Sequence, residues 1–224
     1  MNATETYHLA SFPRSGNTLV RLLLAKYFGV SVPSSFGREN ILDSGSTGFL
    51  NRQAVRGVVF LKTHLAAPPV GEPRGILIIR DGRDTLVSVA HYNQDRDGDK
   101  RPFIDILWEK VRGPEYTQHH LCWLGFSRMA IVRYEDLVRS EEEAVSVLDM
   151  AIEKATGRRM APFPRDGIVS DFESLHRENR KFFRRGIVGS WHTEMPDEIE
   201  DCFWKNHGEM MLRLGYPRGE RKGS

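Results

Sequence analysis

A short apolar run that recurs along the chain constrains the fold most, and in two places it leads through a polar loop into a helical pattern. Such runs occur at 7–12 (YHLASF), 57–62 (GVVFLK), 75–80 (GILIIR) and about 129–133. Continuous runs rich in Val and Ile suit central parallel strands that are buried on both faces. Alternating strands and helices predict an α/β fold, a three-layer sandwich with a central, mostly parallel sheet and helices on both faces. Ligands of such sheets bind at the carboxyl ends of the strands.

Helical patterns occupy most of the remaining chain. They are predicted at 18–28, 81–93, 103–112, 115–127, 140–157 and 195–216. Ser140 is expected to cap its helix, with Glu143 completing a capping box. Ile199, Phe203, Met210 and Leu214 share the inner face of the last helix, which has Pro196 in its first turn and Gly215 after its end. Residues 30–56 indicate an irregular binding loop or lid with at most one short helix, and 93–102 a polar surface loop.

Length and charge narrow the function classes. The 224 residues predict a single domain over 1–224, and a net charge of +2 gives no global field for nucleic acid or an acidic membrane. No signal peptide and no apolar stretch of roughly 20 residues is found, so we expect a cytoplasmic protein. Cys122 and Cys202 fit no metal or redox spacing and are expected as reduced thiols, with a disulfide as the alternative.

The first loop combines a fixed charge, a glycine and hydroxyl or amide donors. Arg14, Ser15, Gly16, Asn17 and Thr18 follow the first strand and open a helix. A helix N-terminus presents unpaired N–H groups and a positive dipole end, so this loop predicts an anion site; an ordinary helix cap is the alternative. The G-x-x-x-x-G-K-[ST] loop of nucleotide hydrolases is absent, which disfavours a Mg²⁺-dependent NTPase.

Two further strand ends carry groups suited to chemistry. Lys62 and His64 end the second strand, where a neutral imidazole can take a proton and a lysine can stabilise developing charge. A capping histidine and a lysine that reaches solvent form the alternative. Arg80 ends the third strand and Ser88 lies eight residues on, an arrangement suited to a phosphate; a structural Arg–Asp cluster is the alternative.

These segments together resemble the sulfotransferases that use 3′-phosphoadenosine 5′-phosphosulfate (PAPS), of the cytosolic and bacterial type. SFPRSGNTLVR resembles the YPKSGTTW loop that holds the 5′-phosphosulfate, and KTHL resembles the K-T-H-L-P element with the catalytic base. IIRDGRDTLVS resembles the R-[ND]-P-[KR]-D-x-x-x-S segment of the 3′-phosphate site. The family lysine is Arg14 here, the family tryptophan is Leu19, and Gly82 replaces a proline, a change that the turn should accept.

The resemblance continues through the second half of the chain. Tyr134 matches the tyrosine of a Y-E-D element on the adenine side, and Phe172 the aromatic of a T/S-x-F segment that stacks on adenine. RRGIVGSW resembles R-K-G-x-x-G-D-W, which assigns Arg184, Arg185 and Gly186 to the 3′-phosphate. Plain core packing is the alternative for Phe172. Glu135 and Asp136 are expected to be structural, as are Arg83 and Asp84.

The resemblance implies sulfuryl transfer from PAPS to a hydroxyl or amine of a small-molecule acceptor. His64 would be the base, Lys62 and Arg14 would stabilise charge, and no metal would be required. A small-molecule kinase and a non-catalytic nucleotide-binding protein are the alternatives. The sequence leaves the acceptor and the oligomeric state open, a homodimer included.

Overall fold

Four parallel strands form the sheet that the apolar runs predict. The computed structural model describes residues 5–33, 57–66, 71–95, 98–162 and 187–219. The strands are β1 (Glu5–Ser11), β2 (Val58–Thr63), β3 (Gly75–Ile79) and β4 (Met129–Arg133). Their order across the sheet is β2-β1-β3-β4, and every neighbouring pair is parallel.

Both faces of the sheet are covered by apolar side chains, because successive residues of a strand point to opposite faces. In β3, Ile76 and Ile78 belong to one apolar cluster, whereas Leu77 and Ile79 belong to a second one. A strand that is apolar on both faces reads as a continuous run rather than an alternating one, as GILII does.

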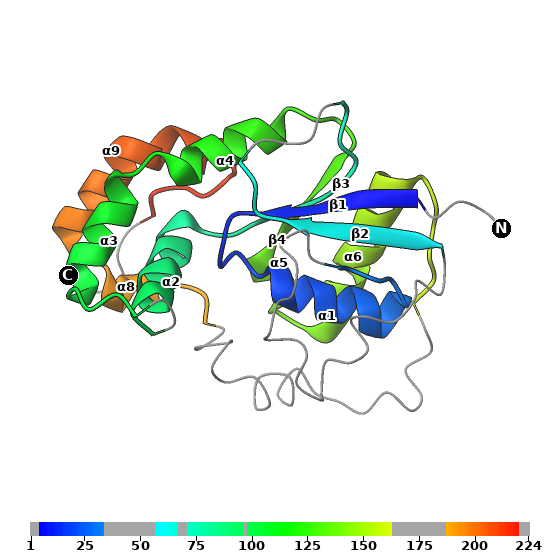
Figure 1. The fold of residues 1–224 in the computed structure, drawn as a ribbon, viewed down its shortest axis with the longest axis horizontal. Coiled ribbons are helices and arrows are strands. Elements are labelled where there is room, and N and C mark those ends of the chain that lie inside the picture. Colours follow the sequence, from blue (N-terminus) through cyan, green and yellow to red (C-terminus); the bar gives the residue numbers. More distant parts are fainter. Residues whose placement is uncertain (1–4, 34–56, 67–70, 96–97, 163–186, 220–224) are drawn as a thin grey trace.

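Helices pack on each of the two clusters. The first cluster contains residues of α1 (Asn17–Phe28), α5 (Tyr134–Leu137) and α6 (Glu141–Thr156). The second contains residues of α2 (Gly82–Asp95), α3 (Phe103–Arg112), α4 (Glu115–Leu124), α8 (Trp191–Glu194) and α9 (Asp197–Arg213). The fold is therefore α/β with a parallel central sheet between helices, as predicted, and Figure 1 shows α2, α3, α8 and α9 gathered beyond the carboxyl ends of the strands.

The order of the strands changes direction between β1 and β3: the chain passes from β1 to β2 on one side and from β3 to β4 on the other. These strands are neighbours, but α1 follows β1 on the side of the first cluster, and α2 follows β3 on the side of the second. Adjacent strands whose following helices diverge leave a crevice at their carboxyl ends, which is where open α/β sheets bind ligands. The fold thus places the loops after β1 and β3 at a binding position.

Several local predictions can be compared with the structure. Ser140 caps α6 by accepting from the Glu143 N–H at 3.1 Å, but the Glu143 carboxylate pairs with Arg139, so the reciprocal half of the capping box is not formed. α4 ends at Leu124, three residues earlier than predicted, and α2 continues to Asp95 into the predicted loop.

The two cysteines, Cys122 and Cys202, are free thiols. Among the described helices, none has the length and apolarity to span a bilayer.

Candidate active site

The loop between β1 and α1 has an unusual backbone. Arg14 has a φ of 68°, the only positive φ of a non-glycine residue in the described part of the chain, and Gly16 has a φ of 100°. A bulky residue in the left-handed region costs free energy, so such a conformation often marks a functional site. Gly16 is required sterically as well, because an added Cβ would lie 2.5 Å from Cδ2 of Tyr134.

Two buried polar atoms beside this loop have no hydrogen-bond partner among the residues that the structure describes. The Ser15 hydroxyl is fully buried and makes no hydrogen bond with the described residues. The Nε atom of Arg80 is also buried and makes none, although the residue as a whole is 8% exposed. A buried donor without a partner costs about 1–3 kcal/mol, a cost that a bound anion would remove. Ser15 at the N-terminus of α1 and Arg80 after β3 are therefore each suited to donate to an oxygen of a phosphate or sulfate group.

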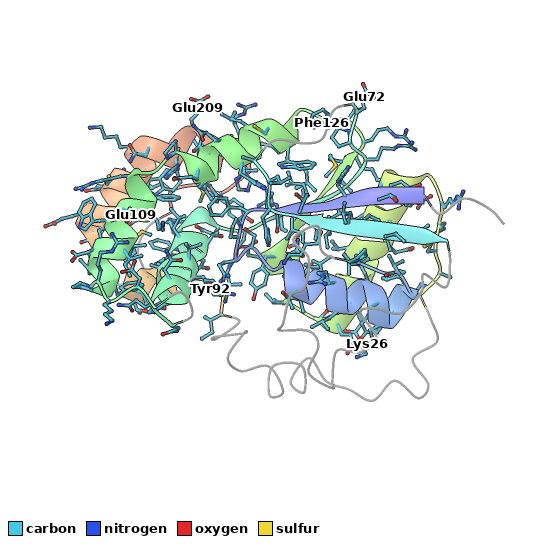
Figure 2. The ribbon with its side chains drawn as sticks, viewed as in Figure 1. Lys26, Glu72, Tyr92, Glu109, Phe126 and Glu209 are labelled. Atoms are coloured by element: carbon cyan, nitrogen blue, oxygen red, sulfur yellow. The ribbon has the colours of Figure 1, made fainter. Side chains whose placement is uncertain are left out.

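Arg14 joins this loop to α2. Its Nε donates to the Ser88 hydroxyl at 3.2 Å, and its guanidinium lies 5.0 Å from the centre of the Tyr92 ring. Figure 2 shows Tyr92 on α2 near the start of α1. Arg14 and Ser88, which are predicted from separate motifs, are thus in direct contact.

Arg80 connects three segments of the site. One terminal nitrogen donates to the carbonyl of Arg14 at 3.2 Å and the other to the carbonyl of Ile187 at 3.3 Å. Its guanidinium lies 4.4 Å from the centre of the Tyr134 ring, which is itself nearly buried against Gly16. The predicted residues Arg14, Arg80, Ser88 and Tyr134 are therefore brought together at the carboxyl ends of β1, β3 and β4.

His64 follows β2 and is held by the last residue of β1. Its Nδ1 lies 2.8 Å from the carbonyl oxygen of Ser11 and 3.2 Å from the Ser11 hydroxyl. Since a carbonyl oxygen can only accept, Nδ1 carries the proton, and Nε2 is the unprotonated nitrogen of the neutral ring. Ser11 was not singled out from the sequence, because it belongs to an apolar run and its role depends on a contact across the sheet.

The remaining predicted residues of the first two strand ends, Lys62, Asn17 and Thr18, are buried. Lys62 is buried and stands opposite Leu9 in the sheet register, and its backbone N–H donates to Pro33. Asn17 donates from its amide nitrogen to the Leu9 carbonyl at 3.3 Å and to the Ser11 hydroxyl at 3.1 Å. Thr18 is nearly buried in the first turn of α1.

Buried imidazoles from α4 border the loop on the side of the second cluster. The ring centres of His119 and Phe12 are 5.8 Å apart, and those of His119 and His120 5.3 Å. Burial lowers the pKa of His119 to about 3, with smaller contributions from His120 and His64, and burial lowers the pKa of His120 to about 4. Both rings are therefore neutral near pH 7, and they were not predicted from the sequence.

The acidic and basic residues expected to be structural brace the turn between β3 and α2. Asp84 accepts from the N–H groups of Gly189 and Trp191 at 2.7 and 3.0 Å, and Arg83 forms ion pairs with Asp81 and Glu200.

Glu135 and the C-terminal tail contribute to the same turn. Glu135 accepts from the Asp81 N–H at 2.9 Å and from the Tyr216 hydroxyl at 2.7 Å, while Arg83 donates to the Arg218 carbonyl at 2.9 Å. Burial is the main cause that raises the pKa of Glu135.

Some predictions cannot be placed, and one departure from the family pattern is explained. Phe172, Arg184, Arg185 and Gly186 lie outside the described residues, as does most of 30–56. Leu19 is 1% exposed within the first cluster, so it is a core residue. Among the described residues, no group of three or more His, Cys, Asp or Glu side chains is arranged to hold a metal ion.

Known proteins resemble this chain in fold and in part of its sequence. Mouse sulfotransferase SULT7A1, solved in complex with PAP, superposes with a TM-score of 0.62 at 17% identity, over 93% of this chain and 85% of that one. A WSCD family member of Aedes aegypti is 29% identical over 63% of this chain and 48% of its own length. Cytosolic sulfotransferase 6 of Arabidopsis thaliana is 24% identical over 56% of this chain and 47% of its own. The matches thus extend over about half the length of these curated relatives.

The match to a family model covers almost the whole chain. The model of the sulfotransferase domain matches residues 6–215, a range that begins in β1 and ends beyond α9. The matched range includes the loop of residues 12–16 between β1 and α1, called the phosphate loop below for its proposed role, together with His64, Arg80 and Tyr134. The chain belongs to the sulfotransferase domain family.

Proposed function

We propose that this chain, as a single domain over residues 1–224, transfers a sulfuryl group from PAPS to a hydroxyl or amine of a small-molecule acceptor and releases adenosine 3′,5′-bisphosphate. The observation that carries the proposal is the position of His64 beside the phosphate loop. Ser11, which binds Nδ1 of His64, lies at the end of β1, and the loop with Arg14 and the unpaired Ser15 hydroxyl follows at once. A proton acceptor and an anion site are thus adjacent.

The donor would be held at both ends of its nucleotide. Arg14, Ser15, Gly16, Asn17 and Thr18 surround the 5′-phosphosulfate, while Arg80, Ser88, Arg184, Arg185 and Gly186 serve the 3′-phosphate and Tyr134 and Phe172 the adenine. Support comes from the Arg14–Ser88 and Arg80–Arg14 contacts, which join the two sets. The unpaired Nε of Arg80 is suited to a charge-assisted hydrogen bond with a phosphate oxygen.

The proposed transfer is a single in-line displacement at sulfur. As the acceptor oxygen or nitrogen forms its bond to sulfur, its proton passes to Nε2 of His64. The bond between sulfur and the bridging oxygen breaks, and its electron pair leaves with the bisphosphate. Lys62 and Arg14 stabilise the charge on the sulfuryl and bridging oxygens. A sulfuryl group carries less charge than a phosphoryl group, so this mechanism requires no metal.

Replacement of His64 tests the proposed base. His64→Ala is expected to lower turnover at least about a hundredfold, the usual contribution of general acid–base catalysis, while the Kd for adenosine 3′,5′-bisphosphate changes less than about twofold. Turnover with a labelled donor and a pool of phenols, alcohols and amines measures the first quantity, and calorimetry the second. Normal turnover by the variant would remove His64 from the mechanism.

Calorimetry on the unmodified chain separates this function from its rivals. Micromolar binding of adenosine 3′,5′-bisphosphate with ATP at least about tenfold weaker supports the sulfotransferase. Equal or tighter binding of ATP supports a kinase, and binding of the bisphosphate without transfer to any acceptor supports a non-catalytic nucleotide-binding protein.

A further inference from the structure

The side chain of Asn17 is directed into the sheet. Its amide nitrogen has two hydrogens, and its two contacts, the Leu9 carbonyl at 3.3 Å and the Ser11 hydroxyl at 3.1 Å, use both of them. The remaining atom, Oδ1, is a buried acceptor without a partner, and an acceptor oxygen does not stabilise an anion. Only the backbone N–H of Asn17 therefore remains suited to a phosphosulfate.

The group that Asn17 holds is the group that holds His64. The Ser11 hydroxyl accepts from Asn17 and lies 3.2 Å from Nδ1 of His64, and the Ser11 carbonyl accepts from the same Nδ1 at 2.8 Å. Ser11 is fully buried and Asn17 is 5% exposed, so bulk water does not compete for these hydrogen bonds. A chain of contacts runs from the first residue of α1, through the end of β1, to the residue after β2.

We infer that Ser11 and Asn17 are positioning residues that fix the tautomer and orientation of the His64 ring, an inference that rests on the proposed role of His64. With the proton on Nδ1 bound to Ser11, Nε2 is the nitrogen that takes a proton. When Nε2 is protonated, the Nδ1–H bond becomes charge-assisted and stabilises the imidazolium. Asn17 also lies at the N-terminus of the phosphate-loop helix, so the same residue ties the base to the loop.

His119 is a neighbouring ring that does not orient His64 through charge. His119 of α4 is neutral near pH 7, because burial lowers its pKa to about 3, so it offers no charge to orient the ring. The carbonyl oxygen and the hydroxyl oxygen of Ser11 lie 2.8 and 3.2 Å from Nδ1 of His64, and both favour the imidazolium.

Replacement of Asn17 by threonine, the residue of the YPKSGTTW pattern, separates positioning from donor binding. Threonine keeps the backbone N–H and a hydroxyl in the loop, but it lacks the amide NH₂ that donates to both the Leu9 carbonyl and the Ser11 hydroxyl. We expect Asn17→Thr to lower kcat about three- to tenfold, the worth of a buried hydrogen bond, with the Kd for adenosine 3′,5′-bisphosphate within about twofold. A residue that only contacts the donor would change that Kd and leave kcat unchanged at saturation.

The dependence of kcat on pH distinguishes a positioning role from a general loss of stability, because lower stability alone would not shift the pH at which kcat falls. Ser11→Ala removes one acceptor from the Nδ1–H, which disfavours the imidazolium. The acid limb of the kcat profile should therefore move to lower pH as the plateau falls. The exposed Ser146→Ala on α6 is the matched control, with an unchanged profile. Long-range ¹H–¹⁵N spectra of labelled protein should show the Nδ1–H tautomer of His64 in the unmodified chain and a tautomer mixture in both variants.

The double variant tests whether the two residues act through one contact chain. Ser11→Ala with Asn17→Thr should lower kcat no further than the more severe single variant, whereas independent roles would multiply the two effects. Unchanged kcat, pH profile and tautomer in both single variants would overturn the inference while His64→Ala remains inactive. An active His64→Ala variant would instead overturn the proposed function.

Discussion

Gly16 combines two constraints that an L side chain cannot meet at once. Its φ of 100° lies in the left-handed region, and the Tyr134 ring occupies the space where a Cβ would stand. The ring in turn lies against Arg80. The close approach of loop and ring therefore fixes the backbone N–H groups at the start of α1.

Gly16→Ala should lower the affinity for adenosine 3′,5′-bisphosphate at least about tenfold. The added methyl group must displace Tyr134, and overpacking of this kind costs about 1–3 kcal/mol in addition to the backbone strain. Calorimetry measures the loss. Gly98→Ala is the matched control, because Gly98 also has a positive φ, 71°, but an added Cβ there meets nothing within 4 Å. Unchanged affinity in Gly16→Ala would contradict this account of the loop.

The residues singled out by their local pattern contact one another in the structure, whereas residues that matter only through a distant partner could not be found in the sequence. Arg14, Arg80 and Ser88 each lie at a strand end or in the helix that follows, and the carboxyl ends of parallel strands converge. Ser11 and His119 have no such local mark. Ser11 contacts a residue 53 positions away, and His119 is one of two adjacent histidines in a helix that reads as ordinary amphipathic sequence.

At the scale of elements, the strands were predictable because their side chains are buried on both faces. The ends of the helices were less predictable than the strands. α4 stops at Leu124 rather than at residue 127, and the carboxylate of Glu143 pairs with Arg139 instead of completing the capping box. Gly82 was expected to substitute for a proline without consequence. In the structure an added Cβ would lie 2.7 Å from the Tyr116 ring and 2.8 Å from the Phe203 ring, so packing against α4 and α9 excludes any side chain there.

Asp84 on α2 holds the start of α8 in place. Its carboxylate accepts hydrogen bonds from the backbone N–H groups of Gly189 and Trp191 and from the Ser190 hydroxyl. Asp84→Asn should lower the free energy of unfolding by about 1–3 kcal/mol, since one buried N–H would face an amide donor. It should also weaken bisphosphate binding, because Arg80 bonds to Ile187 just before this segment. Urea denaturation and calorimetry measure the two effects.

Asp201→Asn is the control for Asp84→Asn. Asp201 forms an exposed ion pair with Arg218, so its replacement should change the free energy of unfolding by less than about 0.5 kcal/mol. Equal effects of the two variants would show that Asp84 does not hold α8 in place.

For the whole molecule, the neutral buried histidines set the response to acid. Burial lowers the pKa of His119 to about 3 and of His120 to about 4, and it also lowers the pKa of His8 and His207. These groups bind protons more readily in the unfolded chain than in the folded one. Stability is therefore complete above the unfolded value near 6.5 and is lost as the pH falls towards the folded values.

The free energy of unfolding should fall by on the order of 4 kcal/mol between pH 6.5 and pH 5, since His119 and His120 each contribute about 1.4 kcal/mol per pH unit over that range. Urea denaturation at a series of pH values gives the slope. His119→Gln keeps a polar side chain and removes one titrating group, so the slope should decrease. A slope that stays the same in the variant would assign the acid response to other groups.

The contacts of Glu135 with Tyr216 and of Arg83 with the Arg218 carbonyl have a practical consequence for anyone who shortens this chain. A protein that stopped at Leu214 would retain every described strand and helix, so its circular dichroism would look native. It would nevertheless lack the two tail contacts that brace the turn behind Arg80. Tyr216 and Arg218 therefore support the turn that lies next to the proposed nucleotide site.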